Sequence, residues 1–266
     1  MPPPRRRPPS KSVARSQVFA RRFIALMIFL AGAGLAWLAW MWWRTEDLRS
    51  VHYPEFGITI PAQYPIHGID VSRYQQGISW KAVREMNSDG IRLGFAFIKA
   101  TEGVSSVDPY FRRNWKRSRD AGIVRGAYHF FLPARSGRIQ AEHFIKTVAL
   151  APGDLPPVVD IENAGGRSPA AVRKELKAWL DITEQYYGVR PIIYTYLSFY
   201  NNYLAGHFDE YPLWVAHYLQ PERPRTTRQW AFWQHSESGR VNGILSKVDF
   251  NVFSGDSAAF RALLVP

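Results

Sequence analysis

Two acidic residues stand two positions apart at the end of a short apolar stretch. The sequence LPPVVDIEN spans residues 155–163 and carries Asp160 and Glu162. Val158 and Val159 are β-branched and apolar, which favours a buried strand. Because residues i and i+2 of a strand point to the same face, we expect the two carboxylates to lie side by side, with Cα atoms about 7 Å apart. Buried acids cost free energy unless they are solvated, paired or used, so this pair is a candidate for acid–base chemistry.

An alternation of strands and helices is expected to position this pair. We predict strands over 66–71, 93–100, 123–131, 157–161, 191–196, 213–216, 230–234 and 248–251. We predict helices over 80–87, 109–121, 139–150, 169–187, 199–204 and 257–264. Units of roughly 25–35 residues are typical of βαβ repeats, and eight strands predict an α/β fold, a TIM-like (β/α) barrel with degraded last helices. An open doubly wound sheet is the alternative, but no phosphate-binding glycine fingerprint follows the first strand.

Polar and aromatic side chains follow or end every predicted strand. Active sites of such barrels lie at the carboxyl ends of the strands, so these residues are expected to line one rim. In chain order they are Asp70, Lys99, Glu102, Tyr128, His129, Asp160, Glu162, Tyr194, Tyr196, Trp214, His217, Tyr218, Trp233, Gln234, Asp249 and Asn251.

A long apolar stretch precedes this domain. Residues 23–43 are uncharged, about the 20 residues that a helix needs to cross a bilayer, and tryptophans crowd its C-terminal half as in an interfacial belt. Basic residues lie almost entirely before it, which predicts a single-pass membrane anchor with a cytoplasmic N-terminus and an extracytoplasmic catalytic part. We expect a disordered basic tail over 1–22, a linker or stalk over 44–65 and the catalytic domain over 66–266. A cleaved signal peptide is the rival, but its apolar region is normally shorter, about 7–15 residues.

Composition excludes several other functions. The net charge is +12, but residues 1–50 alone hold nine Lys and Arg against two Asp and Glu, so nucleic-acid binding is a poor explanation. There is no cysteine, and therefore no thiolate metal site or cysteine nucleophile. The seven histidines show no metal-binding spacing. We expect no metal and no cofactor.

Eight stretches together resemble the glycoside hydrolase family 25 lysozymes, which are N-acetylmuramidases. In the family's order they are HGIDVS (67–72), FIKATEG (97–103), GAYHF (126–130), VDIE (159–162), PIIYT (191–195), LWVA (213–216), WQ (233–234) and VDFN (248–251). The resemblance covers the chain from Gly68 onward. It implies a barrel with about five regular βα units and an irregular remainder. It also implies cleavage of the β-1,4 bond between N-acetylmuramic acid and N-acetylglucosamine in peptidoglycan.

The acids fit that chemistry. Glu162 is the expected general acid, with a pKa raised by burial and a nearby carboxylate. Asp160 is expected to stay ionised, either as the nucleophile or as the group that orients the substrate's N-acetyl group, and the close pair favours retention. Asp70 and Asp249 match family positions on the cleft floor. There we expect them to form hydrogen bonds with sugar or water and to tune the charge of Asp160 and Glu162.

Other rim residues have two interpretations. Tyr128, Tyr194, Trp214 and Trp233 are candidate sugar platforms, with Gln234 as a further substrate-binding residue, although each aromatic side chain is equally compatible with a core position. Lys99 and Glu102 are expected to form an ion pair that supports the rim, and His129 is expected to be structural. The expected partners are peptidoglycan glycan strands and the lipid bilayer, and we expect a monomer.

Two alternatives to a muramidase follow from the same residues. One is a non-catalytic wall-binding module, which the retention of all four acids disfavours. The other is a chitinase-like hydrolase of N-acetylglucosamine polymers, which differs in the substrate that its rim admits.

Overall fold

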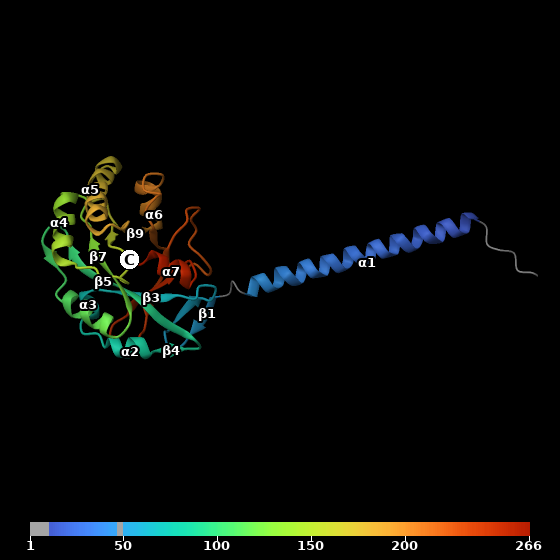
Figure 1. Cartoon of the computed structure of the whole chain (residues 1–266), viewed down its shortest axis with the longest axis horizontal. Helices are drawn as coiled ribbons and strands as arrows, with labels where there is room; N and C mark the ends of the chain where they lie inside the picture. The colour runs from blue at the N-terminus through green and yellow to red at the C-terminus, as the bar shows by residue number, and fades with distance from the viewer. Residues whose placement is uncertain (1–10, 47–49) are drawn as a thin grey trace, which may run out of the picture. The chain divides into compact units, whose positions relative to one another are not determined.

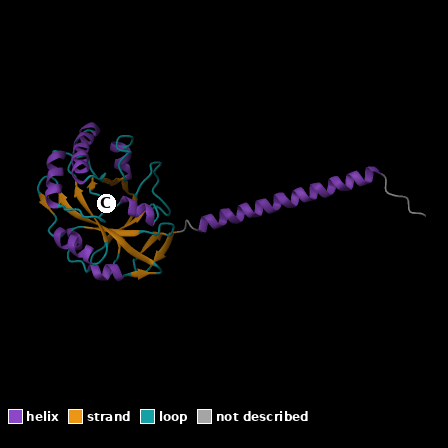
Figure 2. Ribbon diagram, viewed as in Figure 1, coloured by secondary structure: helices purple, strands orange, loops and turns teal. Residues whose placement is uncertain are grey.

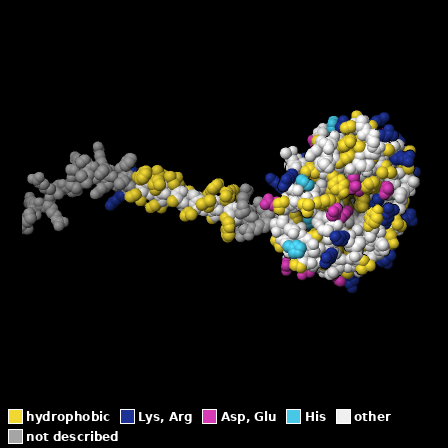
Figure 3. All heavy atoms as spheres, turned by 180° about the vertical axis from the view of Figure 1, so that it is seen from behind, with side chains coloured by type: hydrophobic (Ala, Val, Ile, Leu, Met, Phe, Trp, Pro, Cys, Tyr) yellow, Lys and Arg dark blue, Asp and Glu magenta, His cyan; other side chains and the backbone are white. Residues whose placement is uncertain are grey.

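The computed structural model describes residues 11–46 and 50–266, and the chain divides into an N-terminal unit and a larger one, Arg49–Pro266. Helix α1 (Lys11–Glu46) contains the apolar stretch Arg21–Trp42, whose mean hydropathy is 2.1 and of which none is buried. Figure 3 shows apolar side chains along this stretch. By length and composition, this helix is able to cross a membrane.

The start of α1 differs from the expected disordered tail over 1–22. Residues 11–22 are helical, because this segment contains no proline and more than half of its residues are Ala, Arg, Lys or Gln, which are good helix formers. Residues 1–10 lie outside the described residues.

Eight strands of the larger unit close into a barrel (Figures 1 and 2). They are β3 (His67–Val71), β5 (Ile91–Glu102), β7 (Val124–Phe130), β8 (Val158–Asp160), β9 (Ile192–Tyr196), β10 (Leu213–Ala216), β11 (Phe232–Gly239) and β12 (Val248–Phe253). Because β3 pairs with both β5 and β12, the sheet has no free end there, and the predicted barrel is confirmed against the open sheet. Strands β3 to β11 of this set are parallel, whereas β12 runs antiparallel to both of its neighbours.

Helices cover the barrel on its outside (Figure 2). They are α2 (Trp80–Glu85), α3 (Phe111–Asp120), α4 (Gly137–Thr147), α5 (Pro169–Tyr187) and α6 (Leu197–Phe199), with a 3₁₀ turn η1 (Arg73–Gln75), a π-helical turn η2 (Tyr200–Leu204) and the short strands β4 (Asn87–Ser88) and β6 (Ser106–Val107). Helix α7 (Ser257–Leu263) instead packs its Phe260 against the inward-facing Phe95 and Phe232. Local sequence sets the ends of α5: the Ser168 hydroxyl accepts a hydrogen bond from the Ala171 N–H, and Gly188 ends the helix with a φ of 70°.

A hairpin replaces most of the expected linker over 44–65. Strands β1 (Ser50–Tyr53) and β2 (Ile58–Pro61) pair antiparallel, and Phe56 and Ile60 are fully buried. The Phe56 ring lies 5.2 Å from that of Phe250 on β12. No helix connects β11 to β12, so the outer face of these strands needs another cover, and the hairpin supplies it. The expectation of a stalk is therefore wrong for residues 50–61.

The barrel interior is filled by aromatic side chains below the carboxyl ends of the strands. Side chains alternate between the two faces of a strand, so Phe95 and Phe97 of β5 point inward with Trp214 of β10 and Phe232 of β11. The rings of Phe97 and Trp214 stack at 4.2 Å. This layer forms a rigid floor beneath the rim.

Candidate active site

Asp160 and Glu162 lie at the rim of the barrel where β8 ends. Asp160 is the last residue of β8, in register with Phe130 of β7 and Tyr194 of β9, and it is 6% exposed. Its Oδ1 atom has no hydrogen-bond partner among the described residues. Glu162 follows two residues later and is only partly buried. The short strand therefore delivers one sheltered carboxyl and one that is open to the cleft.

Burial sets the charge state of this pair. Burial raises the pKa of Asp160 well above its usual value, and the nearby Glu162 raises it further. Burial also raises the pKa of Glu162, with Asp70 adding to the rise, which is the direction that a general acid needs. Burial opposes the expected ionised form of Asp160, because its carboxyl is the more deeply buried of the two.

Asp70 and Asp249 lie next to each other across the strand pair β3–β12. They are in register, and because β12 is antiparallel, Asp249 reaches the rim from the beginning of its strand, not from the end as the sequence suggests. Burial raises the pKa of Asp70 to about 6, although the hydrogen bonds that its carboxylate accepts act to lower this pKa. Burial and the charge of Asp70 raise the pKa of Asp249 to about 9. Burial and mutual repulsion therefore both oppose the ionisation of Asp70 and Asp249 together.

Gln234 connects these acids to two tyrosines. Its Nε2 donates to Asp70 Oδ2 at 2.8 Å and, more weakly, to Asp249 Oδ2 at 3.5 Å. Its Oε1 accepts from the hydroxyls of Tyr194 at 2.8 Å and Tyr218 at 2.6 Å. Gln234 is 1% exposed. The side chain that we predicted to bind substrate thus has its amide occupied by the protein and organises the acids.

The predicted sugar platforms take different places. Tyr128 and Tyr194 face the barrel interior, just below the rim, and both are buried. Trp214 also points inward but lies in the aromatic floor, and its Nε1 donates to Asn251 Oδ1 at 2.8 Å. Asn251 in turn donates to Asp70 Oδ2 at 2.8 Å. Trp214 therefore supports the acids from below and is 2% exposed.

Trp233 is not a sugar platform in this structure. It is fully buried on the outer face of the barrel, with its ring 6.1 Å from Tyr64 and 6.2 Å from Trp230. Its Nε1 donates to the backbone oxygen of His217 at 2.9 Å. Because Gln234 points inward, its neighbour Trp233 must point outward. The substrate-binding prediction for Trp233 is wrong for this reason.

Two residues of the network were noted at the rim in the sequence but given no role: Asn251 and Tyr218. Asn251 stands two residues after Asp249, so the strand period places both on the inner face. This two-residue spacing from Asp249 is the sequence signal that could have identified Asn251 as part of the site. Tyr218 lies past the end of β10, and no pattern in the sequence predicts its bond to Gln234.

Lys99, Glu102 and His129 lie as expected. The Lys99 Nζ is 2.7 Å from Glu102 Oε2. His129 is fully buried, with Nδ1 2.7 Å from Thr101 Oγ1 and Nε2 3.1 Å from Gln140 Oε1. Its ring stacks on Trp179 at 5.8 Å, which is a structural role.

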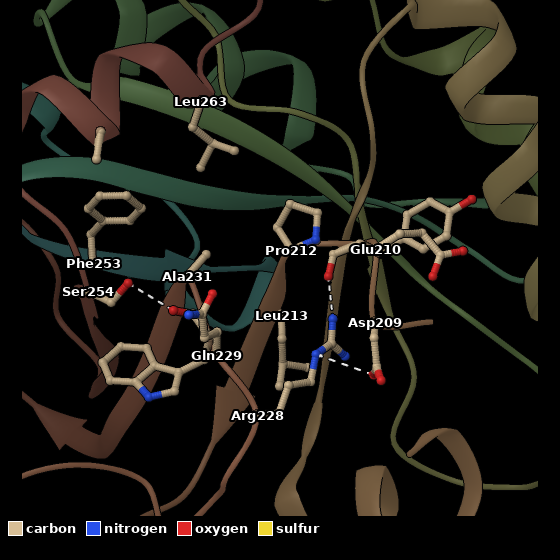
Figure 4. A pocket seen from close by; sticks show the side chains of 13 residues that line it. Asp209, Glu210, Pro212, Leu213, Arg228, Gln229, Ala231, Phe253, Ser254 and Leu263 are labelled. Carbon is tan, nitrogen blue, oxygen red and sulfur yellow. Dashed lines mark hydrogen bonds and ion pairs between the residues drawn. The ribbon is translucent and has the colours of Figure 1, made fainter. Parts of the chain in front are cut away.

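A separate hollow of about 340 Å³ opens at the other end of the barrel (Figure 4). Its wall includes Leu213 and Ala231, at the beginnings of β10 and β11, and Phe253, at the end of the reversed β12. Asp209 in this wall pairs with Arg228 at 3.7 Å. The aromatic floor separates this hollow from the acid pair, so we place the chemistry at the rim.

A (β/α) barrel with a coupled carboxyl pair at the carboxyl ends of its strands has the arrangement of a barrel glycoside hydrolase. Comparison with known proteins specifies the class further. Residues 69–244 match the family model of glycosyl hydrolases family 25. This chain therefore belongs to glycosyl hydrolase family 25, and it is a glycoside hydrolase of the lysozyme, or N-acetylmuramidase, type.

Individual relatives agree with this assignment. Lysozyme M1 of Streptomyces globisporus is 36% identical over 213 residues, which cover 74% of this chain and 71% of that protein. The uncharacterized protein YegX of Escherichia coli (strain K12) is 51% identical over 209 residues, 79% of this chain and 77% of that one. The structure of a family 25 glycosyl hydrolase from Bacillus anthracis matches with a TM-score of 0.69 at 34% identity, covering 75% of this chain and 94% of that chain.

Proposed function

We propose that this enzyme cleaves the β-1,4 bond between N-acetylmuramic acid and N-acetylglucosamine in peptidoglycan, with Glu162 as general acid. The observation that carries the proposal is the carboxyl pair at the end of β8, where Asp160 is buried and Glu162 is partly exposed. Membership of family 25 and the likeness to Lysozyme M1 support the substrate. A raised pKa keeps the proton on Glu162, from where it passes to the leaving glycosidic oxygen.

Asp160 acts on the other side of the reaction. We propose that substrate binding ionises it, because a hydrogen bond donated to a carboxylate lowers its pKa. The unpartnered Oδ1 is an acceptor for the N–H of the substrate's acetamido group. Asp160 then orients that group for attack on the sugar carbon, or attacks the carbon itself. Both routes invert the anomeric carbon twice, and the product retains its configuration.

Two substitutions test these roles. Glu162→Gln removes the proton donor and Asp160→Asn removes the anion, while both keep the side-chain shape. We expect each to lower kcat on insoluble peptidoglycan by a factor of about 10² to 10⁴, the usual contribution of acid–base catalysis. Proton NMR of the first-formed product should show the β-anomer. A first-formed α-anomer would exclude retention, and full activity of Glu162→Gln would remove it from the acid role.

De-N-acetylated peptidoglycan separates the two routes. If the acetamido group attacks, the wild-type enzyme leaves this substrate uncleaved while it still cleaves the acetylated form. If Asp160 attacks directly, the de-N-acetylated form is cleaved and a covalent glycosyl-enzyme forms. Chitin oligomers are the parallel substrate, because cleavage of chitin in preference to peptidoglycan would favour the chitinase-like alternative.

We also propose that α1 anchors the enzyme in the cytoplasmic membrane, with its N-terminus inside and residues 50–266 outside, where it remodels the cell's own wall. The exposed apolar stretch Arg21–Trp42 and the basic residues before it support this topology. In membrane fractions, full-length protein should resist extraction at high salt, and protease added to spheroplasts should remove residues 50–266. Recovery of intact protein only from soluble fractions would contradict the anchor.

A further inference from the structure

The FIKATEG stretch places a cation among the acids of the rim. Lys99 follows Phe95 and Phe97 on the inner face of β5, one layer above the aromatic floor. Its side chain is 15% exposed, so the ammonium group is largely withdrawn from water. A buried ammonium group is costly unless it is paired, and Glu102 is a partner that is 38% exposed and faces the solvent side.

The position of Lys99 is fixed relative to Asp160. Its Nζ lies 4.7 Å from the centre of the Phe130 ring, and Phe130 is the register partner of Asp160 on the neighbouring strand. An ion pair at 2.7 Å on one side and an aromatic ring on the other hold the ammonium group in one place. Lys99 itself is in register with Tyr128, one row below Phe130, so its ammonium group extends from that row to the ring of the residue that is in register with Asp160.

The other charges around Asp160 are mostly negative. The titratable groups that act on it or respond to it are Glu162, Lys99, Asp70, Glu102, Tyr128, Tyr194 and Tyr196. Lys99 lowers the pKa of both Asp160 and Glu162, whereas Glu102 raises that of Asp160. The two members of one ion pair thus act on Asp160 in opposite directions.

We propose that Lys99 is a positioning residue for the reaction, a fixed cation that stabilises the ionised form of Asp160. Glu102 sets the strength of this effect by partly neutralising the ammonium group. This role rests on the proposed function of the pair. It goes beyond support of the rim. If the ion pair only supported the rim, removal of either partner would have the same effect on catalysis, whereas a charge effect gives opposite pH shifts.

The test compares the pH dependence of kcat/KM for the full-length wild type, Lys99→Met, Lys99→Arg and Glu102→Gln. Lys99→Met should move the acid limb to higher pH by about one unit, the effect of one charge at close range in a partly buried site. Glu102→Gln should move the same limb to lower pH. Lys99→Arg keeps the charge and should restore most of the wild-type profile. Because the pair is coupled, these limbs report apparent values for the pair.

Lys116→Met is the matched control, since Lys116 also forms an ion pair, with Asp120, but is 77% exposed on α3. It should leave the profile unchanged. Thermal unfolding of each variant separates folding from charge effects. Shifts of the same sign in Lys99→Met and Glu102→Gln, or no shift in either, would overturn the proposal. A wild-type domain without activity on peptidoglycan would instead refute the proposed function.

Discussion

Replacement of Gln234 by methionine tests whether this residue organises the acids or binds the substrate. Methionine has a similar length and volume, so the change removes the amide and leaves the packing. The structure shows three short hydrogen bonds to this amide, from the hydroxyls of Tyr194 and Tyr218 and to the carboxylate of Asp70. All three partners lose a bond at once.

The magnitude follows from the burial of these partners. An unpaired buried polar group costs roughly 1–3 kcal/mol. Tyr194 and Asp70 are buried, whereas Tyr218 is partly exposed and is able to bond water. Asp70 keeps the hydrogen bond from Asn251, so the main cost is the buried Tyr194 hydroxyl. We therefore expect a loss of about 2 kcal/mol in the free energy of unfolding, which corresponds to roughly 4–8 °C in Tm for a domain of this size. Asp70 also loses a donor that lowers its pKa, so its pKa rises above the wild-type value.

Calorimetry and steady-state kinetics on residues 50–266 measure the result. We expect kcat to fall by at least about tenfold while KM changes little, because an amide that does not touch the sugar contributes no uniform binding. Gln185→Met, at an exposed position of α5, is the control and should behave as wild type. A raised KM with unchanged kcat and Tm would refute this reasoning and restore the substrate-binding role.

Three further predictions concern the rest of the domain. Phe56→Ala should lower the free energy of unfolding by about 3 kcal/mol, seen as a Tm lower by roughly 6–12 °C. Val51→Ala, at an exposed position of the same hairpin, should have little effect. Equal effects of the two substitutions would mean that the hairpin does not pack on the barrel. Trp233→Phe should lower Tm and leave KM within about twofold, whereas a sugar platform would show a raised KM. Burial lowers the pKa of His67 to about 4, so its neutral form stabilises the fold above pH 6.5 and this contribution disappears as the pH falls from 6.5 to 4. Relative to His67→Leu, the wild type should therefore lose about 2 kcal/mol between pH 7.5 and pH 5 in urea titrations, and a pH-independent difference would contradict the buried neutral imidazole.

The strands of the barrel were predictable because each is a short apolar run between turn residues. The run at 213–216 has the same bounds in the structure as in the prediction. The antiparallel direction of β12 was not recognised, since the alternation of apolar residues along a strand is the same whichever way the strand runs. Only residues 240–247 separate β11 from β12, which is too short for the crossover that parallel neighbours need. Connection length was the missing criterion.

The hairpin was missed for a different reason. Pro54, Gly57 and Pro61 suggest a linker, yet Tyr53, Ile58 and Ile60 are apolar and buried. A sequence shows that these residues are apolar but not which surface they cover, because that surface exists only where β11 and β12 lack a helix. Proline at the end of a strand and glycine in its turn are compatible with a hairpin.

The acids of the site were predictable, whereas the depth of its aromatic residues was not. Asp160, Glu162 and Asp70 lie at one rim because each is close to the carboxyl end of a parallel strand, and Asp249 joins them from the beginning of the antiparallel β12. Trp233 and Gln234 are neighbours, so only one of them is able to face inward. Whether an inward aromatic side chain meets the sugar or the floor depends on its layer, and Trp214 lies below the acids.

Digestion of purified peptidoglycan is the most direct test of the central claim. The sample should be residues 50–266, which keep the hairpin, with Glu162→Gln as control, and products should be identified by mass spectrometry after borohydride reduction. We predict reduced muramic acid ends from the wild type and their loss in the variant. Reduced glucosamine ends, or no products from a folded wild-type domain, would contradict a muramidase that uses Glu162.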